Sequence, residues 1–183
     1  MSVDHVPLFY LRQKFAVTIN RYELQADDGR VLALAEQKRF ALKEEVTFYA
    51  DQTKSQKVFS FKARAVMDLN AGYDVFDEQH QPIGFFRKDF GASLLRSTFH
   101  IEGPGYAGTG QERSQAVALL RRFADIPFLP IHFDYVTAEG QPLLAVERQG
   151  TVRDRYTIHV PDPRVDFRVA AAVAVAMDAL MAR

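Results

Sequence analysis

Cationic side chains recur close to the ends of several predicted β-strands. If these ends share one rim of a barrel, the cations gather there and attract phosphate, which needs only clustered charges and backbone donors. A simpler interpretation is that charged strand ends keep a β-rich protein soluble and discourage edge pairing, and the sequence alone favours it. The candidate ligand-binding residues are Lys38, Arg39, Lys62, Arg64, Arg87, Lys88 and Arg148.

One pair of residues has the spacing of a metal or acid–base site. His132 and Asp134 lie two apart in a predicted strand and therefore share a face. No third ligand has a suitable spacing, so a polar outer face is the favoured interpretation. The chain also lacks the G-x-S-x-G and H-E-x-x-H patterns of hydrolases. We therefore name no catalytic residue and expect no metal and no cofactor.

Three glycines match the G-x-G-x-x-G pattern of dinucleotide-binding proteins. They are Gly103, Gly105 and Gly108, with Asp125 at about the distance of a ribose-binding acid. That pattern works only in a β-α-β unit, whereas this chain alternates hairpins, so a glycine-rich hairpin turn is favoured. An amphipathic helix is expected over Ser114–Asp125, as a lid or crossover. A pocket between this helix and the Gly103–Gly110 loop is the alternative site for a small ligand or an enzyme reaction.

A repeated hairpin supplies the strands that position these residues. Residues 22–38, 73–88 and 133–148 each begin with an aromatic residue and reach Gly29, His80 or Gly140 seven positions later. This spacing predicts a turn in which the glycines take positive φ, so His80 is predicted to be a turn residue. Two copies continue with a proline, Pro82 or Pro142, that starts an edge or bulged strand. Residues 49–64 form a degenerate fourth copy, and residues 94–109 can form another hairpin.

The C-terminal residues 165–181 predict a helix that is apolar on every face. Such a helix must be surrounded by protein or lipid, and its uninterrupted apolar run is shorter than the roughly 20 residues that span a bilayer. We expect a buried helix that begins with Asp162 as its cap and Pro163 at the first helical position. Asp178 follows nine apolar residues and needs a partner, and we expect a structural pair with a strand arginine or backbone amides.

Composition limits the classes of function. The 183 residues carry 23 basic and 23 acidic side chains, so no overall field favours nucleic acid. The absence of cysteine excludes disulfides and thiolate sites. The first seven residues lack a secretory signal. We expect one intracellular domain over residues 1–183 with a core from about 8 to 181, cytoplasmic and without a transmembrane segment.

These elements predict a mainly β fold, in which antiparallel hairpins close into a barrel around the buried C-terminal helix. The opening YLRQK (residues 10–14), the repeated hairpins and the closing YTIHVPDPRVDFRVAAAVAVAMDAL (residues 156–180) resemble the LURP-one-related family, in the group of Tubby C-terminal domains and phospholipid scramblases. The resemblance runs from about Leu8 to Leu180 and implies a barrel of about twelve strands. Tubby-like domains bind phosphoinositide head groups through strand-end cations, for which Lys38 and Arg39 are the nearest match.

The leading hypothesis is a non-enzymatic Tubby-like binding or scaffolding module, whose unknown ligand could be an anionic lipid or a phosphorylated head group. Lipid scrambling is not expected, because the chain lacks the cysteines, proline-rich tail and acidic calcium-binding segment of scramblases. Two alternatives stay open: a small-ligand protein or enzyme using the Gly103–Gly110 pocket, and a structural domain that binds only a protein partner.

Overall fold

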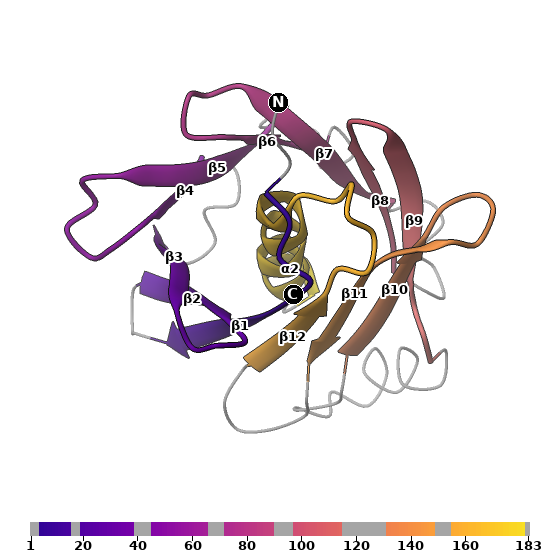
Figure 1. Ribbon diagram of the computed structural model, residues 1–183, viewed down its shortest axis with the longest axis horizontal. Helices are drawn as coiled ribbons and strands as arrows, with labels where there is room; N and C mark the ends of the chain where they lie inside the picture. The colour runs from indigo at the N-terminus through magenta and orange to yellow at the C-terminus, as the bar shows by residue number, and fades with distance from the viewer. Residues whose placement is uncertain are drawn as a thin grey trace.

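Antiparallel strands follow one another around a ring and close on themselves, β1 pairing with both β2 and β12 (Figure 1). The computed structural model describes residues 4–15, 19–38, 45–65, 72–89, 97–114, 131–148 and 155–181, and these form twelve strands and one helix. The closed antiparallel barrel predicted from the hairpins is confirmed. The strands are β1 Leu8–Phe15, β2 Ile19–Ala26, β3 Val31–Lys38, β4 Val46–Tyr49, β5 Lys57–Ala63, β6 Tyr73–Phe76, β7 Pro82–Asp89, β8 Thr98–Gly103, β9 Tyr106–Glu112, β10 Ile131–Val136, β11 Pro142–Arg148 and β12 Arg155–His159.

The repeated hairpins have one turn geometry. In β2–β3, β6–β7 and β10–β11 the fourth turn residue takes positive φ, which is 88° at Gly29, 63° at His80 and 80° at Gly140. In each, the carbonyl of the first turn residue accepts the N–H of that fourth residue, and its own N–H donates to the carbonyl of the fifth residue. This is a three-residue loop with a type I turn and a left-handed bulge residue. His80 is therefore the turn residue that its alignment with two glycines predicted.

A register shift accompanies each of these turns, just before the strand enters the loop. Pro82 and Pro142 start β7 and β11 beside these bulges, where the missing N–H leaves no ladder bond unmade. The degenerate copy forms β4–β5, with a longer turn and positive φ at Lys54. The β8–β9 hairpin turns at Pro104 and Gly105.

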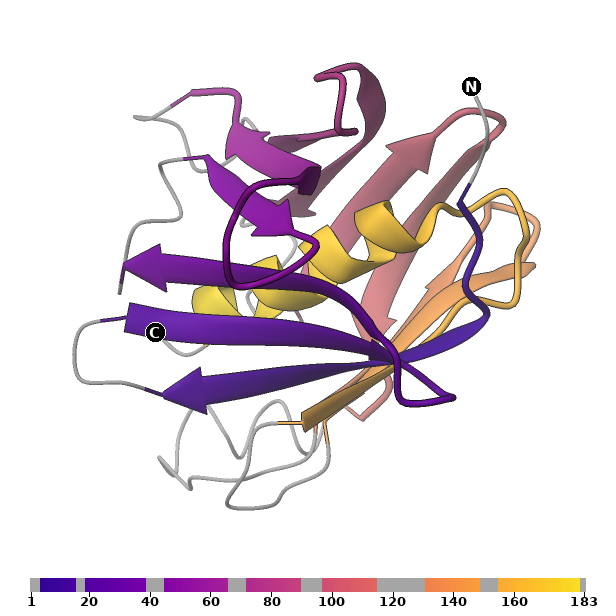
Figure 2. The ribbon, with the colours of Figure 1, turned by 60° about the vertical axis from the view of Figure 1, so that its left-hand side comes forward.

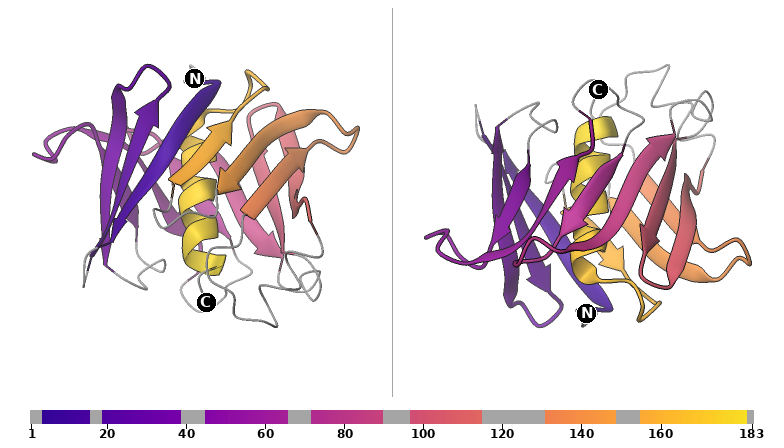
Figure 3. Two further views of the ribbon diagram at one scale, coloured as in Figure 1. Left: turned by 90° about the horizontal axis from the view of Figure 1, so that it is seen from below. Right: turned by 90° about the horizontal axis from the view of Figure 1, so that it is seen from above.

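The axis of the barrel is occupied by α2, Phe167–Met181 (Figures 1 and 2). Every side chain from Val169 to Met177 is at most 1% exposed, and the helix runs inside the ring of strands (Figure 3). Eight of the strands also contribute fully buried aromatic rings to this core, with Phe9 and Phe59 packing edge-on against Phe167. The alanines keep the helix slim enough to fit this space, so the prediction of a buried helix is confirmed. No described helix is long and apolar enough to cross a membrane.

The predicted start of the helix was wrong by four residues. The helix begins at Phe167, and its N-cap is Asp166, whose Oδ1 accepts the backbone N–H of Arg168 at 2.9 Å. Asp162 and Pro163 lie in the preceding turn, where Asp162 accepts the backbone N–H of Arg164 at 2.9 Å. Asp162 therefore has a capping role in a turn instead of in the helix.

Two predicted features lie wholly or partly outside the described residues. The structure describes Ser114 of the expected Ser114–Asp125 helix but not residues 115–125. Asp178 belongs to α2, but its side chain is not described, so its structural pairing stays a prediction.

Candidate functional site

The ends of the odd-numbered strands share one rim of the barrel. Because consecutive strands are antiparallel, the turns between β2 and β3, β6 and β7, and β10 and β11 all lie at one rim, and β3, β5, β7 and β11 end at the other. We call the rim with the hairpin turns the turn rim and the rim where β3, β5, β7 and β11 end the basic rim. The basic rim carries the predicted ligand-binding residues Lys38, Lys62, Arg64, Arg87, Lys88 and Arg148.

Lys62 and Arg87 are the available cations of the basic rim. Both side chains are exposed, and neither forms a hydrogen bond or an ion pair with any residue that the structure describes. Lys62 lies opposite Asp74 in the strand register, but that carboxylate is bound by Arg64. Arg87 lies opposite His100 on β8. These two positive charges therefore face solvent.

Arg64 differs, because a carboxylate already neutralises it. Its Nε lies 3.0 Å from both carboxylate oxygens of Asp74, and its Nη2 lies 2.7 Å from Oδ1. The guanidinium also stacks on Phe85, 3.9 Å from the ring centroid. The hydrogen bond to Asp74 raises the pKa of Arg64. This geometry makes Arg64 a fixed part of the outer wall.

Lys88 and Arg148 lie on the inner side of the rim. Lys88 is opposite the buried Phe99, with its Nζ 5.9 Å from that ring, and Arg148 is opposite the buried Ile131 and Tyr156. Both side chains are half-buried and have interaction partners. Lys38 ends β3 without a described side chain, and Arg39 lies outside the described residues.

For His132 and Asp134 the sequence favoured a polar outer face over a metal or acid–base site, and the structure adds an arginine that the sequence did not reveal. Nε and Nη2 of Arg113 lie 2.7 and 2.6 Å from the two oxygens of Asp134, and Nη2 lies 3.4 Å from Glu147. The hydrogen bonds from Arg113 lower the pKa of Asp134 and raise that of Arg113. Among the described side chains, no three metal-ligating groups come together.

The glycines of the G-x-G-x-x-G pattern serve the β8–β9 hairpin. Gly105 takes a φ of 79°, while the space beside Gly103 and Gly108 is filled by Tyr106 and Leu143.

A shallow groove of about 340 Å³ runs along the β8–β9 hairpin, bordered by His100, Thr109 and Thr137. A smaller hollow of about 240 Å³ lies on the outer wall between the β4–β5 turn and β3. Glu36 lines this hollow and forms ion pairs with both Arg21 and Lys54.

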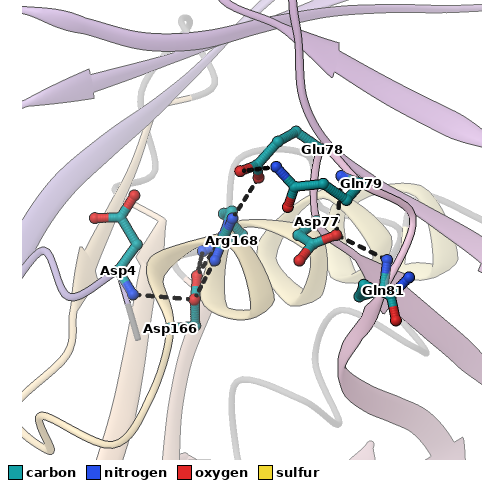
Figure 4. A network of polar contacts seen from close by, with 7 residues as sticks. All are labelled: Asp4, Asp77, Glu78, Gln79, Gln81, Asp166 and Arg168. Carbon is teal, nitrogen blue, oxygen red and sulfur yellow. Dashed lines mark hydrogen bonds and ion pairs between the residues drawn. The ribbon is translucent and has the colours of Figure 1, made fainter. Parts of the chain in front are cut away.

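The opposite rim, which carries the hairpin turns, holds an ion-pair network in which Arg168 and Asp166 are buried (Figure 4). Arg168 binds Asp166 through Nε at 2.9 Å and Nη2 at 2.7 Å, and its Nη1 reaches Glu78 at 3.0 Å. The backbone N–H of Asp4 donates to Asp166 at 3.1 Å, while the Asp4 carbonyl accepts from Phe167 at 2.9 Å. These contacts fix the N-terminal segment and the β6–β7 turn to the start of α2.

Comparison with protein-family models gives a match to the model described as LURP-one-related over residues 31–178. This range covers most of the barrel, from β3 into α2. A comparison with curated proteins gave no match.

Proposed function

The chain belongs to the LURP-one-related family, and from this premise we propose that it is a non-enzymatic, Tubby-like binding module for an anionic lipid or another phosphorylated head group. The ligand contacts the basic rim, where Lys62 and Arg87 supply positive charge. The proposed location is the cytoplasm, with which the absence of cysteine is compatible.

The observation that carries this proposal is a difference between the two rims. At the turn rim, Arg30, Arg164 and Arg168 each bind the aspartate two residues before them, at distances of 2.7, 2.6 and 2.7 Å. At the basic rim, Lys62 and Arg87 have no such partner among the described residues. Cations without an internal counter-ion are the ones that can bind an external phosphate.

The filled interior supports binding at the surface. The residues of α2 from Val169 to Met177 and the inward rings of the strands are buried together as one core. A head group therefore has access to the rims and the outer wall, and not to the axis of the barrel. At the basic rim, Lys62 and Arg87 offer such a head group positive charge that no described carboxylate neutralises.

Vesicle flotation tests the proposal with a double charge reversal at the basic rim. Wild-type protein should float with phosphatidylcholine vesicles that contain phosphatidylserine or a phosphoinositide, and Lys62→Glu/Arg87→Glu should stay in the soluble fraction. Arg30→Glu is the matched control, because it reverses an exposed arginine at the turn rim. Equal flotation of the double variant, or no flotation of the wild type, would overturn the proposal.

A further inference from the structure

Barrel closure places Arg12 directly opposite Arg155. The two are register partners between β1 and β12, next to the pair formed by Leu11 and Tyr156. Leu11 and Tyr156 are completely buried, and successive side chains of a strand point to opposite faces. Arg12 and Arg155 therefore project from the outer wall, on backbones only about 4.5–5.5 Å apart.

No carboxylate compensates this pair within the part of the chain that the structure describes. The Arg12 side chain forms no hydrogen bond or ion pair there, although Glu23 lies opposite it on β2. The guanidinium of Arg155 lies over the ring of Tyr10. Two other outward arginines do have a close acid: Arg21 binds Glu36 at 3.0 Å and Arg113 binds Asp134 at 2.6 Å.

Like charges directly opposite each other on a sheet destabilise it. The Arg12–Arg155 pair is thus a local excess of positive charge that an external anion would relieve. No ion pair joins either arginine to the nearby acids among the described residues, and Asp27 accepts the hydroxyl of Tyr10 at 3.1 Å.

One of the two guanidinium groups is already oriented. Arg155 lies over the ring of Tyr10, 4.3 Å from its centroid, and the bond from the Tyr10 hydroxyl to Asp27 holds the far end of that ring. A guanidinium stacked on a ring keeps its N–H groups free at its edge. Less side-chain freedom is then lost when a ligand binds.

We propose that Arg12 and Arg155 form a binding site for a phosphate monoester. A doubly charged monoester presents three terminal oxygens, enough for two guanidinium groups to donate in pairs. This site goes beyond the proposed function, because it lies on the outer wall, uses neither Lys62 nor Arg87, and requires no membrane. Its ligand is a free phosphate compound or the head group of a monoester lipid.

Thermal unfolding with inorganic phosphate, at an ionic strength matched with sodium chloride, tests the site. Phosphate should raise the melting temperature of the wild type by mass action. In Arg12→Gln and Arg155→Gln the apparent Kd should rise about tenfold or more. Arg12→Lys should also bind more weakly, because lysine keeps the charge and loses the planar fork.

Arg21→Gln is the matched control, since it removes an outward arginine of the neighbouring strand that already has a partner. It should respond to phosphate as the wild type does. Without phosphate and at low salt, Arg12→Gln should melt at or above the wild-type temperature, because repulsion is removed. An undiminished phosphate response in Arg12→Gln, or an equal loss in Arg21→Gln, would refute the site.

Vesicles distinguish the source of the phosphate. If the ligand is a lipid, vesicles containing phosphatidic acid, a monoester, should bind the wild type better than vesicles containing phosphatidylserine, a diester, and Arg12→Gln/Arg155→Gln should lose this difference. If inorganic phosphate binds through the pair and the vesicles show no difference, the ligand is a soluble monoester. Flotation lost in Lys62→Glu/Arg87→Glu but unchanged in Arg12→Gln/Arg155→Gln, with no phosphate response, supports the proposed function and overturns this site.

Discussion

Arg168 and Asp166 form a bidentate ion pair at the start of α2, with Nε of Arg168 2.9 Å from Oδ1 of Asp166 and Nη2 2.7 Å from Oδ2. An aspartate two residues before an arginine also pairs at Asp28–Arg30 in the β2–β3 turn. The difference is burial, since the side chains of Arg168 and Asp166 are 9% and 7% exposed, and those of Arg30 and Asp28 are 76% and 54% exposed. The two pairs allow a matched comparison.

Asp166→Asn should lower the free energy of unfolding by about 3 kcal/mol, because it leaves the buried Arg168 without its main counter-ion. Asparagine still caps a helix well, so the loss reports the charge and not the cap. Asp28→Asn should cost much less, because solvent screens that exposed ion pair. Urea unfolding of both variants measures the difference, and equal losses would show that burial does not set the strength of these pairs.

Gly140→Ala should destabilise the protein by about 1–2 kcal/mol, because alanine at a φ of 80° is strained. No atom lies within 4 Å of the position that its Cβ would take, so the cost is conformational and not a clash. Gly140→Asn should recover much of the loss, since asparagine tolerates this region. Thermal unfolding gives both values, and a wild-type melting temperature for Gly140→Ala would contradict the left-handed turn.

Local patterns predicted the parts of this fold that depend on neighbouring residues. His80 aligned with Gly29 and Gly140, and all three take positive φ because one turn geometry recurs. The apolar residues of α2 likewise predicted burial, since a helix without a polar face must be enclosed.

Contacts between distant segments could not be predicted in the same way. Asp162 and Pro163 have the local signature of a helix start, but Asp166 is the N-cap because Asp4 and Arg168 bind its carboxylate. The pairing of Arg12 with Arg155 depends on the register at which the barrel closes, and no local pattern of either strand specifies that register.

Acid should weaken the Asp134–Arg113 pair. The hydrogen bonds from Arg113 lower the pKa of Asp134 below its ordinary value of 3.8. A lowered folded-state pKa contributes stability that is fully present above the unfolded value and is lost as pH falls through the folded one. Asp134→Asn should therefore reduce the difference in unfolding free energy between about pH 7 and about pH 3.

Arg113→Gln provides the check on this interpretation. This substitution removes the cause of the lowered Asp134 pKa and leaves the carboxylate in place. It should therefore also reduce the difference in unfolding free energy between the two pH values. Urea unfolding at the two pH values measures all three proteins. A wild-type pH dependence in both variants would show that other carboxylates account for the acid sensitivity.

Gly84 on β7 lets the helix approach the wall of the barrel. A Cβ at this position would lie 2.6 Å from Cγ2 of Val169 and 3.1 Å from the carbonyl oxygen of Glu102. Gly84→Ala should therefore cost about 1–3 kcal/mol, as overpacking of a core does. Val169→Ala removes the closer of these two atoms, Cγ2 of Val169, but leaves the Glu102 carbonyl oxygen of β8 in place.

The double variant Gly84→Ala/Val169→Ala should consequently lose less stability than the sum of the two single losses, with a coupling of about 0.5–3 kcal/mol. Rescue should be incomplete, because the Glu102 carbonyl oxygen cannot be removed by changing a side chain. Val173→Ala is the control, since Val173 is equally buried in α2 and is not among the atoms closest to Gly84. Additive losses in Gly84→Ala/Val169→Ala would mean that the helix does not rest against β7 at this glycine.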